Sequence, residues 1–213
     1  NRQIKFFSSP CLTNYNALNT IWLLSTIVPV YLNFIIMTLP NLSLQFNVSL
    51  RNLLKKAITM LRGLLLVLLC LAVGFISSLY QTVALVDWYP YLAKSALSPA
   101  PMVFPIVWCI LYILIGISAA LAMSPKIPVT REKKRTIRLF WIQLALNFLW
   151  SILFFYFMSP VWALIDIIFL DLVVVLYFMT AFKVHKWAAF LYIPYLLWLA
   201  LATYLNIFIV MFN

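Results

Sequence analysis

Polar and aromatic side chains that could line a small-molecule pocket recur at helical spacing in the most apolar parts of this chain. Gln143 and Asn147 are four residues apart and Trp150 follows three residues later, so the three share one face of a helix. Trp108 and Trp198 also lie several residues inside apolar stretches, away from the ends where tryptophan usually collects in membrane proteins. Such side chains either line a pocket or pack helices together, and the pattern alone leaves both interpretations open.

Two carboxylates also fall within apolar stretches. Asp166 lies four residues after Trp162, and Asp171 lies deeper in the same stretch. A charged side chain near the centre of a bilayer costs about 2.5–3.5 kcal/mol on insertion scales, so each should face other helices or be neutralised. The alternative role is a hydrogen bond between helices, worth roughly 0.6 kcal/mol. We expect Asp166 to be structural or to face a pocket, and we assign no role to Asp171.

The other reactive residue types do not form a catalytic set. The single histidine, His185, lies in a short basic segment, and the three cysteines, Cys11, Cys70 and Cys109, are far apart. These positions provide neither a metal-ligand cluster nor a nucleophile with its base. Three glycines form no phosphate-binding loop. We therefore expect no required cofactor and no metal.

The composition indicates which elements position these residues. Hydrophobic residues make up 66% of the 213 positions and charged residues only 9%, against about 25% charged residues in a soluble domain. Five apolar stretches are each long enough to cross a bilayer as a helix. We predict an all-α integral membrane protein, a bundle of five transmembrane helices over residues 61–80, 102–122, 137–157, 161–182 and 187–211.

The basic residues flank these stretches unevenly. Lys94 is alone in the loops on one side, whereas the other side holds twelve, namely Arg51, Lys55, Lys56, Arg62, Lys126, Arg131, Lys133, Lys134, Arg135, Arg138, Lys183 and Lys186. By the positive-inside rule, the first predicted span begins inside and the chain ends outside. The net charge of +11 thus reflects topology and not nucleic-acid binding, and the pattern suits a bacterial cytoplasmic membrane.

Residues 1–59 form a segment that the five predicted spans do not need. Residues 17–39 are apolar enough for a sixth span, although Pro29 interrupts them. A cleaved signal peptide is a competing interpretation, but no typical cleavage site follows. Because Met60 directly precedes the first strong span, we expect the native protein to begin near Met60 and residues 1–59 to be non-native or dispensable.

Residues 60–213 resemble one known family over five clusters in the same order. The clusters are Trp88-Tyr89-x-x-Leu92-x-Lys94, Pro99-x-Pro101-x-Val103-Phe104-Pro105-x-Val107-Trp108-x-x-Leu111-Tyr112, Gln143-Leu144-Ala145-Leu146-Asn147-Phe148-x-Trp150, Trp162-Ala163-Leu164-x-Asp166 and Pro194-Tyr195-Leu196-x-Trp198-x-Ala200-x-Ala202-Thr203-x-Leu205-Asn206. They resemble the tryptophan-rich sensory protein/translocator protein (TspO/MBR) family, which includes the mitochondrial peripheral benzodiazepine receptor. The domain boundary is therefore expected between residues 59 and 60.

The resemblance implies a five-helix bundle, a homodimer, and a pocket that binds tetrapyrroles such as protoporphyrin IX. Carried over by position together with Asp166, the expected ligand-binding residues are Phe104, Trp108, Asn147, Trp150, Trp162, Asp166, Trp198, Ala202 and Leu205. Trp108 and Trp198 match the tryptophans implicated in light-dependent porphyrin breakdown, so they are the expected catalytic residues if the protein is photochemical. A porphyrin is expected as a ligand and not as a cofactor.

Departures from the family pattern favour a bacterial member. The animal cholesterol motif requires a tyrosine and an arginine where Ile207 and Met211 stand. We expect a receptor or sensor that binds tetrapyrroles or similar amphiphiles, linked to porphyrin handling and the stress response. The alternatives are a light-dependent porphyrin-degrading enzyme, a small porphyrin or lipid transporter, and a purely structural protein.

Gly116 and Ala120 permit close helix contact, and we favour packing within the bundle over dimerisation for them.

Overall fold

The computed structural model describes residues 11–213, with side chains described at Tyr31, at Phe34 and from Gln45 onward. The chain divides into two units between Lys56 and Ala57, and each is described by itself. Helix α1 (Cys11–Leu79) supplies all of the first unit's described backbone and then continues into the second. The side chains of residues 17–39, apart from Tyr31 and Phe34, lie outside the described residues, so the sixth span stays a prediction.

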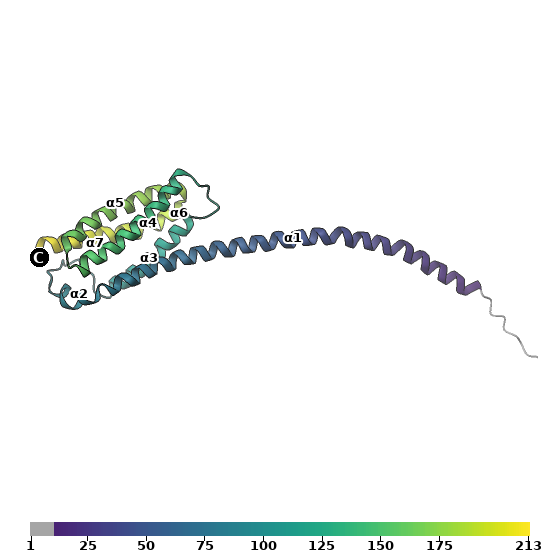
Figure 1. Cartoon of the computed structure of the whole chain (residues 1–213), viewed down its shortest axis with the longest axis horizontal. Helices are drawn as coiled ribbons and strands as arrows, with labels where there is room; N and C mark the ends of the chain where they lie inside the picture. The colour runs from purple at the N-terminus through teal and green to yellow at the C-terminus, as the bar shows by residue number, and fades with distance from the viewer. Residues whose placement is uncertain (1–10) are drawn as a thin grey trace, which may run out of the picture. The chain divides into compact units, whose positions relative to one another are not determined.

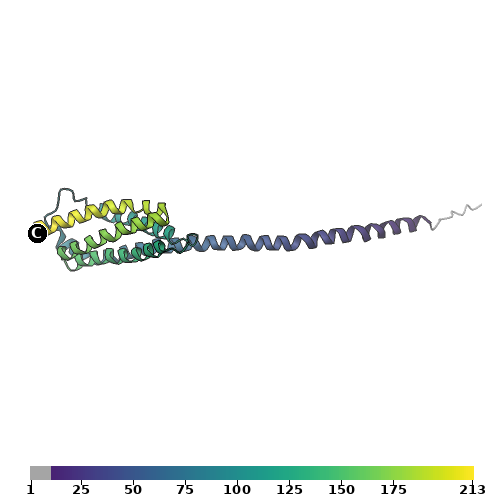
Figure 2. The same ribbon diagram turned by 90° about the horizontal axis from the view of Figure 1, so that it is seen from above.

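Among the described residues, five helical segments are long and apolar enough to cross a membrane, which confirms the predicted fold class. They are Gln45–Leu79 of α1; α3 (Val103–Ala122); α4 (Arg131–Ser151) continued by the π-helix η2 (Ile152–Tyr156); α5 (Pro160–Val184); and α6 (Lys186–Phe190) continued by α7 (Ile193–Phe212). Short helices α2 (Thr82–Asp87) and η1 (Tyr89–Tyr91) lie between α1 and α3. In the second unit, α3, α4, α5 and α7 run side by side (Figures 1 and 2).

Helix α4 begins six residues before the predicted third span. The side chain of Thr130 caps it by accepting a hydrogen bond from the backbone N–H of Lys133 at 3.2 Å, and Glu132 lies in the first turn, where a negative charge is favourable. The basic residues that end the apolar stretch therefore do not end the helix. The buried Lys133 ammonium donates to the carbonyls of Ser124 and Ile127 at 2.7 and 2.8 Å, which fixes the α3–α4 connection.

Glycines set the contact between α1 and α3. A Cβ atom added at Gly116 would lie 2.5 Å from the Cα atom of Val67, so the two helix backbones approach closely there. A Cβ atom added at Gly74 would overlap the ring of Tyr112. The spacing of Gly116 and Ala120 thus serves packing within the bundle, as expected from the sequence.

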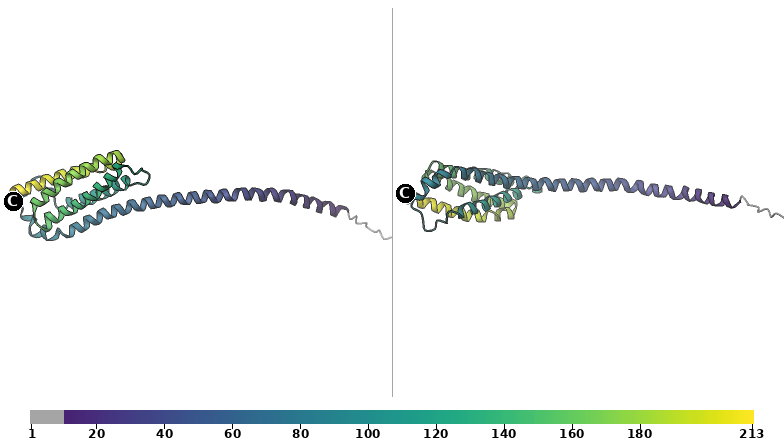
Figure 3. Two further views of the ribbon diagram at one scale, coloured as in Figure 1. Left: turned by 45° about the horizontal axis from the view of Figure 1, so that its top comes forward. Right: turned by 90° about the horizontal axis from the view of Figure 1, so that it is seen from below.

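The core of the second unit is rich in tyrosine. Tyr112, Tyr177, Tyr192 and Tyr195 are all buried among aliphatic residues of α1, α3, α4 and α5. Large apolar side chains also remain exposed on all five segments, as expected of helices that face lipid. The turned views in Figure 3 show how closely the second unit's helices gather around this core.

Candidate ligand pocket

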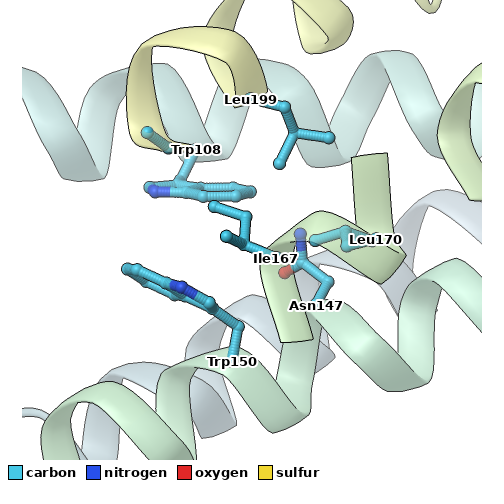
Figure 4. Close-up of a pocket in the computed structure, with 7 residues that line it drawn as sticks. Trp108, Asn147, Trp150, Ile167, Leu170 and Leu199 are labelled. Carbon is cyan, nitrogen blue, oxygen red and sulfur yellow. The ribbon is translucent and has the colours of Figure 1, made fainter. Parts of the chain in front are cut away.

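A small cavity lies between four helices of the second unit. Its free volume is about 10 Å³, enough for about one water molecule. Figure 4 shows the indole of Trp108 lying over the indole of Trp150, with the gap between them closed on one side by aliphatic residues of α5. The lining residues are Trp108 of α3, Asn147 and Trp150 of α4, Ile167 and Leu170 of α5, and Leu199 and Ala202 of α7.

The amide of Asn147 is held at both ends by tyrosines. The Tyr112 hydroxyl donates to Asn147 Oδ1 at 2.6 Å, and Asn147 Nδ2 donates to the Tyr195 hydroxyl at 2.8 Å. All three side chains are buried, so the two bonds hold the amide group in place between the two rings. One N–H and one oxygen lone pair of Asn147 are left for a bound molecule. Asn147 is therefore a pre-oriented polar anchor in an otherwise apolar cavity.

Trp150 is also fixed in place. Its Nε1 donates to Asn206 Oδ1 at 3.1 Å, and Asn206 Nδ2 donates to the carbonyl of Pro160 at 2.9 Å. The indole stacks on Phe154, with ring centroids 5.0 Å apart and planes inclined by 19°. Phe154 belongs to η2, and π-helical turns of this kind often occur at functional sites. The wider turn that follows Trp150 thus places a second aromatic ring behind the cavity wall.

Trp108 forms the opposite wall through ring contacts. Its centroid lies 5.5 Å from that of Tyr112 and 6.3 Å from that of Tyr195, the two tyrosines that hold Asn147. One turn earlier on α3, Phe104 meets Trp198 of α7 edge to face at 5.7 Å. The cavity and this second aromatic pair therefore occupy successive turns between α3 and α7.

The structure brings four of the nine predicted binding residues to the cavity, namely Trp108, Asn147, Trp150 and Ala202. The half-buried Phe104 and Trp198 pair with each other beside it, and Leu205 and Asp166 are buried outside its lining. The Oδ2 atom of Asp166 has no hydrogen-bond partner among the described residues.

Trp162 differs most from its expected place, since its side chain is 63% exposed and does not line the cavity. The inward face of α5 runs through Ala163, Ile167 and Leu170, and Trp162 lies to one side of it in the first turn. Sequence reasoning did not find Ile167, Leu170 and Leu199. The spacing of Ile167 and Leu170 at i and i+3 is a weak signal, because apolar pairs of that kind occur throughout these helices.

The connection between α1 and α3 packs against the end of the bundle next to Trp150. Trp88 and Tyr89 contact Phe154 edge to face, with centroids 5.6 and 6.3 Å apart, and Tyr89 also contacts Phe155. Burial raises the pKa of the Tyr89 hydroxyl, and the Lys94 ammonium lies 4.9 Å from the centroid of its ring.

Side chains of α7 and of Asn213, the residue that follows it, fasten the same connection. The backbone N–H of Ala93 donates to Asn213 Oδ1 at 2.8 Å, and Asn213 Nδ2 donates to the carbonyl of Ala93 at 3.3 Å. The hydroxyls of Ser95 and Tyr204 are hydrogen-bonded at 3.0 Å. The connection is thus bound to α7 on one side and to the aromatic group behind Trp150 on the other.

Comparison with known proteins identifies the family. Residues 66–212 match the TspO/MBR family. The chain belongs to this family. It is 39% identical over 149 residues to the tryptophan-rich protein TspO of Chlorobaculum tepidum, a match that covers 68% of this chain and 91% of that protein. It is 37% identical over 147 residues to the TspO of Archaeoglobus fulgidus, covering 69% of this chain and 94% of that protein. It is also 33% identical over 119 residues to the human translocator protein, covering 56% and 70%.

These matches confirm the resemblance read from the residue clusters. Together with the five apolar helices, membership of the TspO/MBR family makes the chain an integral, multi-pass membrane protein. The relatives carry the names of tryptophan-rich sensory proteins and translocator proteins. All seven residues that line the cavity lie within the matched range, so the cavity belongs to the part of the chain shared with the family.

Proposed function

We propose that this protein is a membrane receptor that binds a tetrapyrrole such as protoporphyrin IX, or a similar flat amphiphile, in the cavity between Trp108 and Trp150. The observation that carries the proposal is the pair of facing indoles with the pre-oriented amide of Asn147 at their edge. Aromatic stacking contributes about 0.5–1.5 kcal/mol per ring pair beyond the area buried. The receptor would serve porphyrin handling and the stress response.

The cavity must widen before it can hold a macrocycle. Its free volume of about 10 Å³ is far below the roughly 300–1,000 Å³ of pockets for drug-sized ligands. Binding therefore requires a more open arrangement of the bundle, and the observed affinity is reduced by the fraction of molecules that adopt it. The orientation proposed from the basic residues, in a bacterial cytoplasmic membrane, puts the α1–α3 connection on the outer side, next to the Trp150 end of the cavity.

The alternative function is light-dependent breakdown of the bound porphyrin. Trp108 favours it, because an oxidisable indole lines the cavity itself. Trp198 is separated from the lining and contacts Phe104 instead. Replacing Trp108 and Trp198 by Phe separates the two functions, since a receptor retains most of its binding whereas an enzyme loses turnover under illumination.

The test is protoporphyrin IX binding to the whole purified chain in lipid nanodiscs, followed in the dark by the shift of the porphyrin absorption band. We expect saturable binding that Trp150→Ala and Asn147→Ala each weaken at least several-fold. Trp162→Ala is the matched control, because it removes an indole that does not line the cavity. Equal affinities in the wild type and all three variants, with each protein folded, would rule out this cavity as the site.

A further inference from the structure

Two fully buried side chains close to the cavity carry polar atoms for which no hydrogen bond of good geometry is found among the described residues, although the Tyr192 ring stacks on Tyr177 with centroids 4.0 Å apart. Gln143 of α4 and Tyr192, just before α7, are both 0% exposed. The atoms without a hydrogen-bond partner are Nε2 and Oε1 of Gln143 and the hydroxyl of Tyr192. Buried polar groups in proteins nearly always have a partner, in the protein or in ordered water. These atoms therefore point to a molecule bound between them.

The register of the helices puts Gln143 and Tyr192 at the same level of the bundle. Helices α4 and α7 both pack against α5, and α4 and α7 run in the same direction along the bundle (Figure 1). Asn147 is bonded directly to Tyr195. Gln143 precedes Asn147 by four residues and Tyr192 precedes Tyr195 by three, so each lies one helical turn earlier on its own element. We call the pair Asn147 and Tyr195 and the pair Gln143 and Tyr192, one turn before it, the polar row. The rings of Tyr192 and Tyr195 are in contact, with centroids 5.7 Å apart.

In the first pair of this row, the amide of Asn147 bonds directly to the hydroxyl of Tyr195. In the second pair, the amide of Gln143 and the hydroxyl of Tyr192 do not bond to each other. A carboxamide offers both donors and an acceptor, and a phenol offers one donor and acceptor oxygen. An ordered internal water typically makes about three hydrogen bonds to such groups. The donors and acceptors of Gln143 and Tyr192 therefore suit a small neutral molecule that both donates and accepts hydrogen bonds. Neither side chain carries a charge that could bind an ion.

We propose that Gln143 and Tyr192 bind an internal water molecule one helical turn from the cavity-lining residue Asn147. The water accepts from Gln143 Nε2 and is shared by Gln143 Oε1 and the Tyr192 hydroxyl. It extends the polar row that begins at Tyr112, Asn147 and Tyr195. This inference is independent of which ligand the cavity binds, because the site is complete in the protein without one.

A direct test uses NMR of the whole chain in nanodiscs with ¹⁵N-labelled glutamine. The side-chain amide signal of Gln143 is assigned by its loss in Gln143→Met. We expect a cross-relaxation peak between this amide and the water resonance with the sign of a long-lived bound water. A clean Gln143 signal without such a peak would show that the site is dry and would overturn the proposal.

A second test compares the thermal unfolding midpoints of Gln143→Met, Tyr192→Phe and the double variant. If a water links the two side chains, each single change lowers the midpoint, and the double change lowers it by less than the sum, because no partner is then left unsatisfied. If the site is dry, each change removes an unpaired buried polar group, so the midpoints rise or stay constant and add. Gln143→Met combined with Tyr204→Phe is the control, since Tyr204 bonds Ser95 far along α7 and should be additive.

Discussion

The contact between Gly74 and Tyr112 gives the sharpest test of how the bundle holds its polar anchor. A Cβ atom added at Gly74 would lie 2.6 Å from Cδ2 and 3.1 Å from Cζ of the Tyr112 ring. Such separations are shorter than van der Waals contact, so the ring has to move in Gly74→Ala. The Tyr112 hydroxyl donates to Asn147 Oδ1, and a displaced ring loses that bond. A single methyl group added on α1 therefore affects the cavity-lining residue Asn147 by displacing the Tyr112 ring.

The opposing contributions can be compared. Overpacking costs about 1–3 kcal/mol, the lost hydrogen bond about 0.6 kcal/mol in a membrane bundle, and alanine gains about 1 kcal/mol over glycine in a helix. The net destabilisation of Gly74→Ala is then about 0.6–2.6 kcal/mol, or a fall of roughly 1–10 °C in the unfolding midpoint at about 2–4 °C per kcal/mol. Gly63→Ala is the matched control on the same helix, because its Cβ atom would meet Ala120 at an ordinary 3.5 Å. The control should keep or raise the midpoint.

The assay is thermal unfolding of both variants in the same detergent, together with protoporphyrin IX titration. We expect a lower midpoint and weaker binding for Gly74→Ala alone. Gly74→Ala combined with Tyr112→Leu should recover part of the lost stability, since the smaller side chain makes room for the methyl group, but it should not recover binding that depends on the held amide. An unchanged midpoint and affinity in Gly74→Ala would refute the steric argument.

Two further predictions concern the ends of the bundle. Lys133→Met removes the ammonium that bonds the carbonyls of Ser124 and Ile127. It should lower the free energy of unfolding by about 1–3 kcal/mol and speed backbone hydrogen exchange over residues 124–130. Lys134→Met, at the exposed neighbouring lysine, should change neither the stability nor the exchange rate. Tyr204→Phe removes the bond to Ser95 and should cost about 0.5–1.5 kcal/mol. It should raise both the association and the dissociation rate of porphyrin in stopped-flow measurements, because the α1–α3 connection is fastened less tightly. Tyr91→Phe, at a side chain that is 84% exposed, should leave both rates unchanged.

The sequence predicted the positions of the spans better than it predicted which face of each helix is buried. Hydropathy alone located all five segments, because lipid imposes length and composition on each of them. The start of α4 was predicted six residues late, since a charge limits a span but not a helix. For Trp162, a difference of one position on α5 separates the exposed face from the buried Ala163. Periodicity within one helix does not fix its rotation about its own axis, which is set by packing against its neighbours.

Within the site, polar spacing was more informative than apolar spacing. Asn147 and Trp150 stood out because polar and indole groups are uncommon deep in an apolar stretch, and both line the cavity. Their partners did not stand out. Tyr112 and Tyr195 lie inside predicted spans, but nothing in the sequence assigned them a polar partner, whereas in the structure each is buried and bonded to Asn147. Which tyrosine hydroxyls turn inward depends on contacts between helices, such as the space that Gly74 leaves for Tyr112.

The two indole walls of the cavity are held with different strength, and this difference indicates how the cavity opens. Trp150 donates to Asn206 and stacks on Phe154, on a helix that packs extensively against α5. Trp108 is held by ring contacts, with no hydrogen bond from its Nε1 among the described residues, on a helix that packs less extensively against α4 and α7. We therefore expect Trp108 and α3 to move when a flat ligand enters, while Trp150 and Asn147 keep their positions. A spin label at the exposed Cys109 should then report the motion on porphyrin binding, whereas a label introduced on α4 at the exposed Ala145 should not. Equal responses at the two sites would contradict a fixed Trp150 wall.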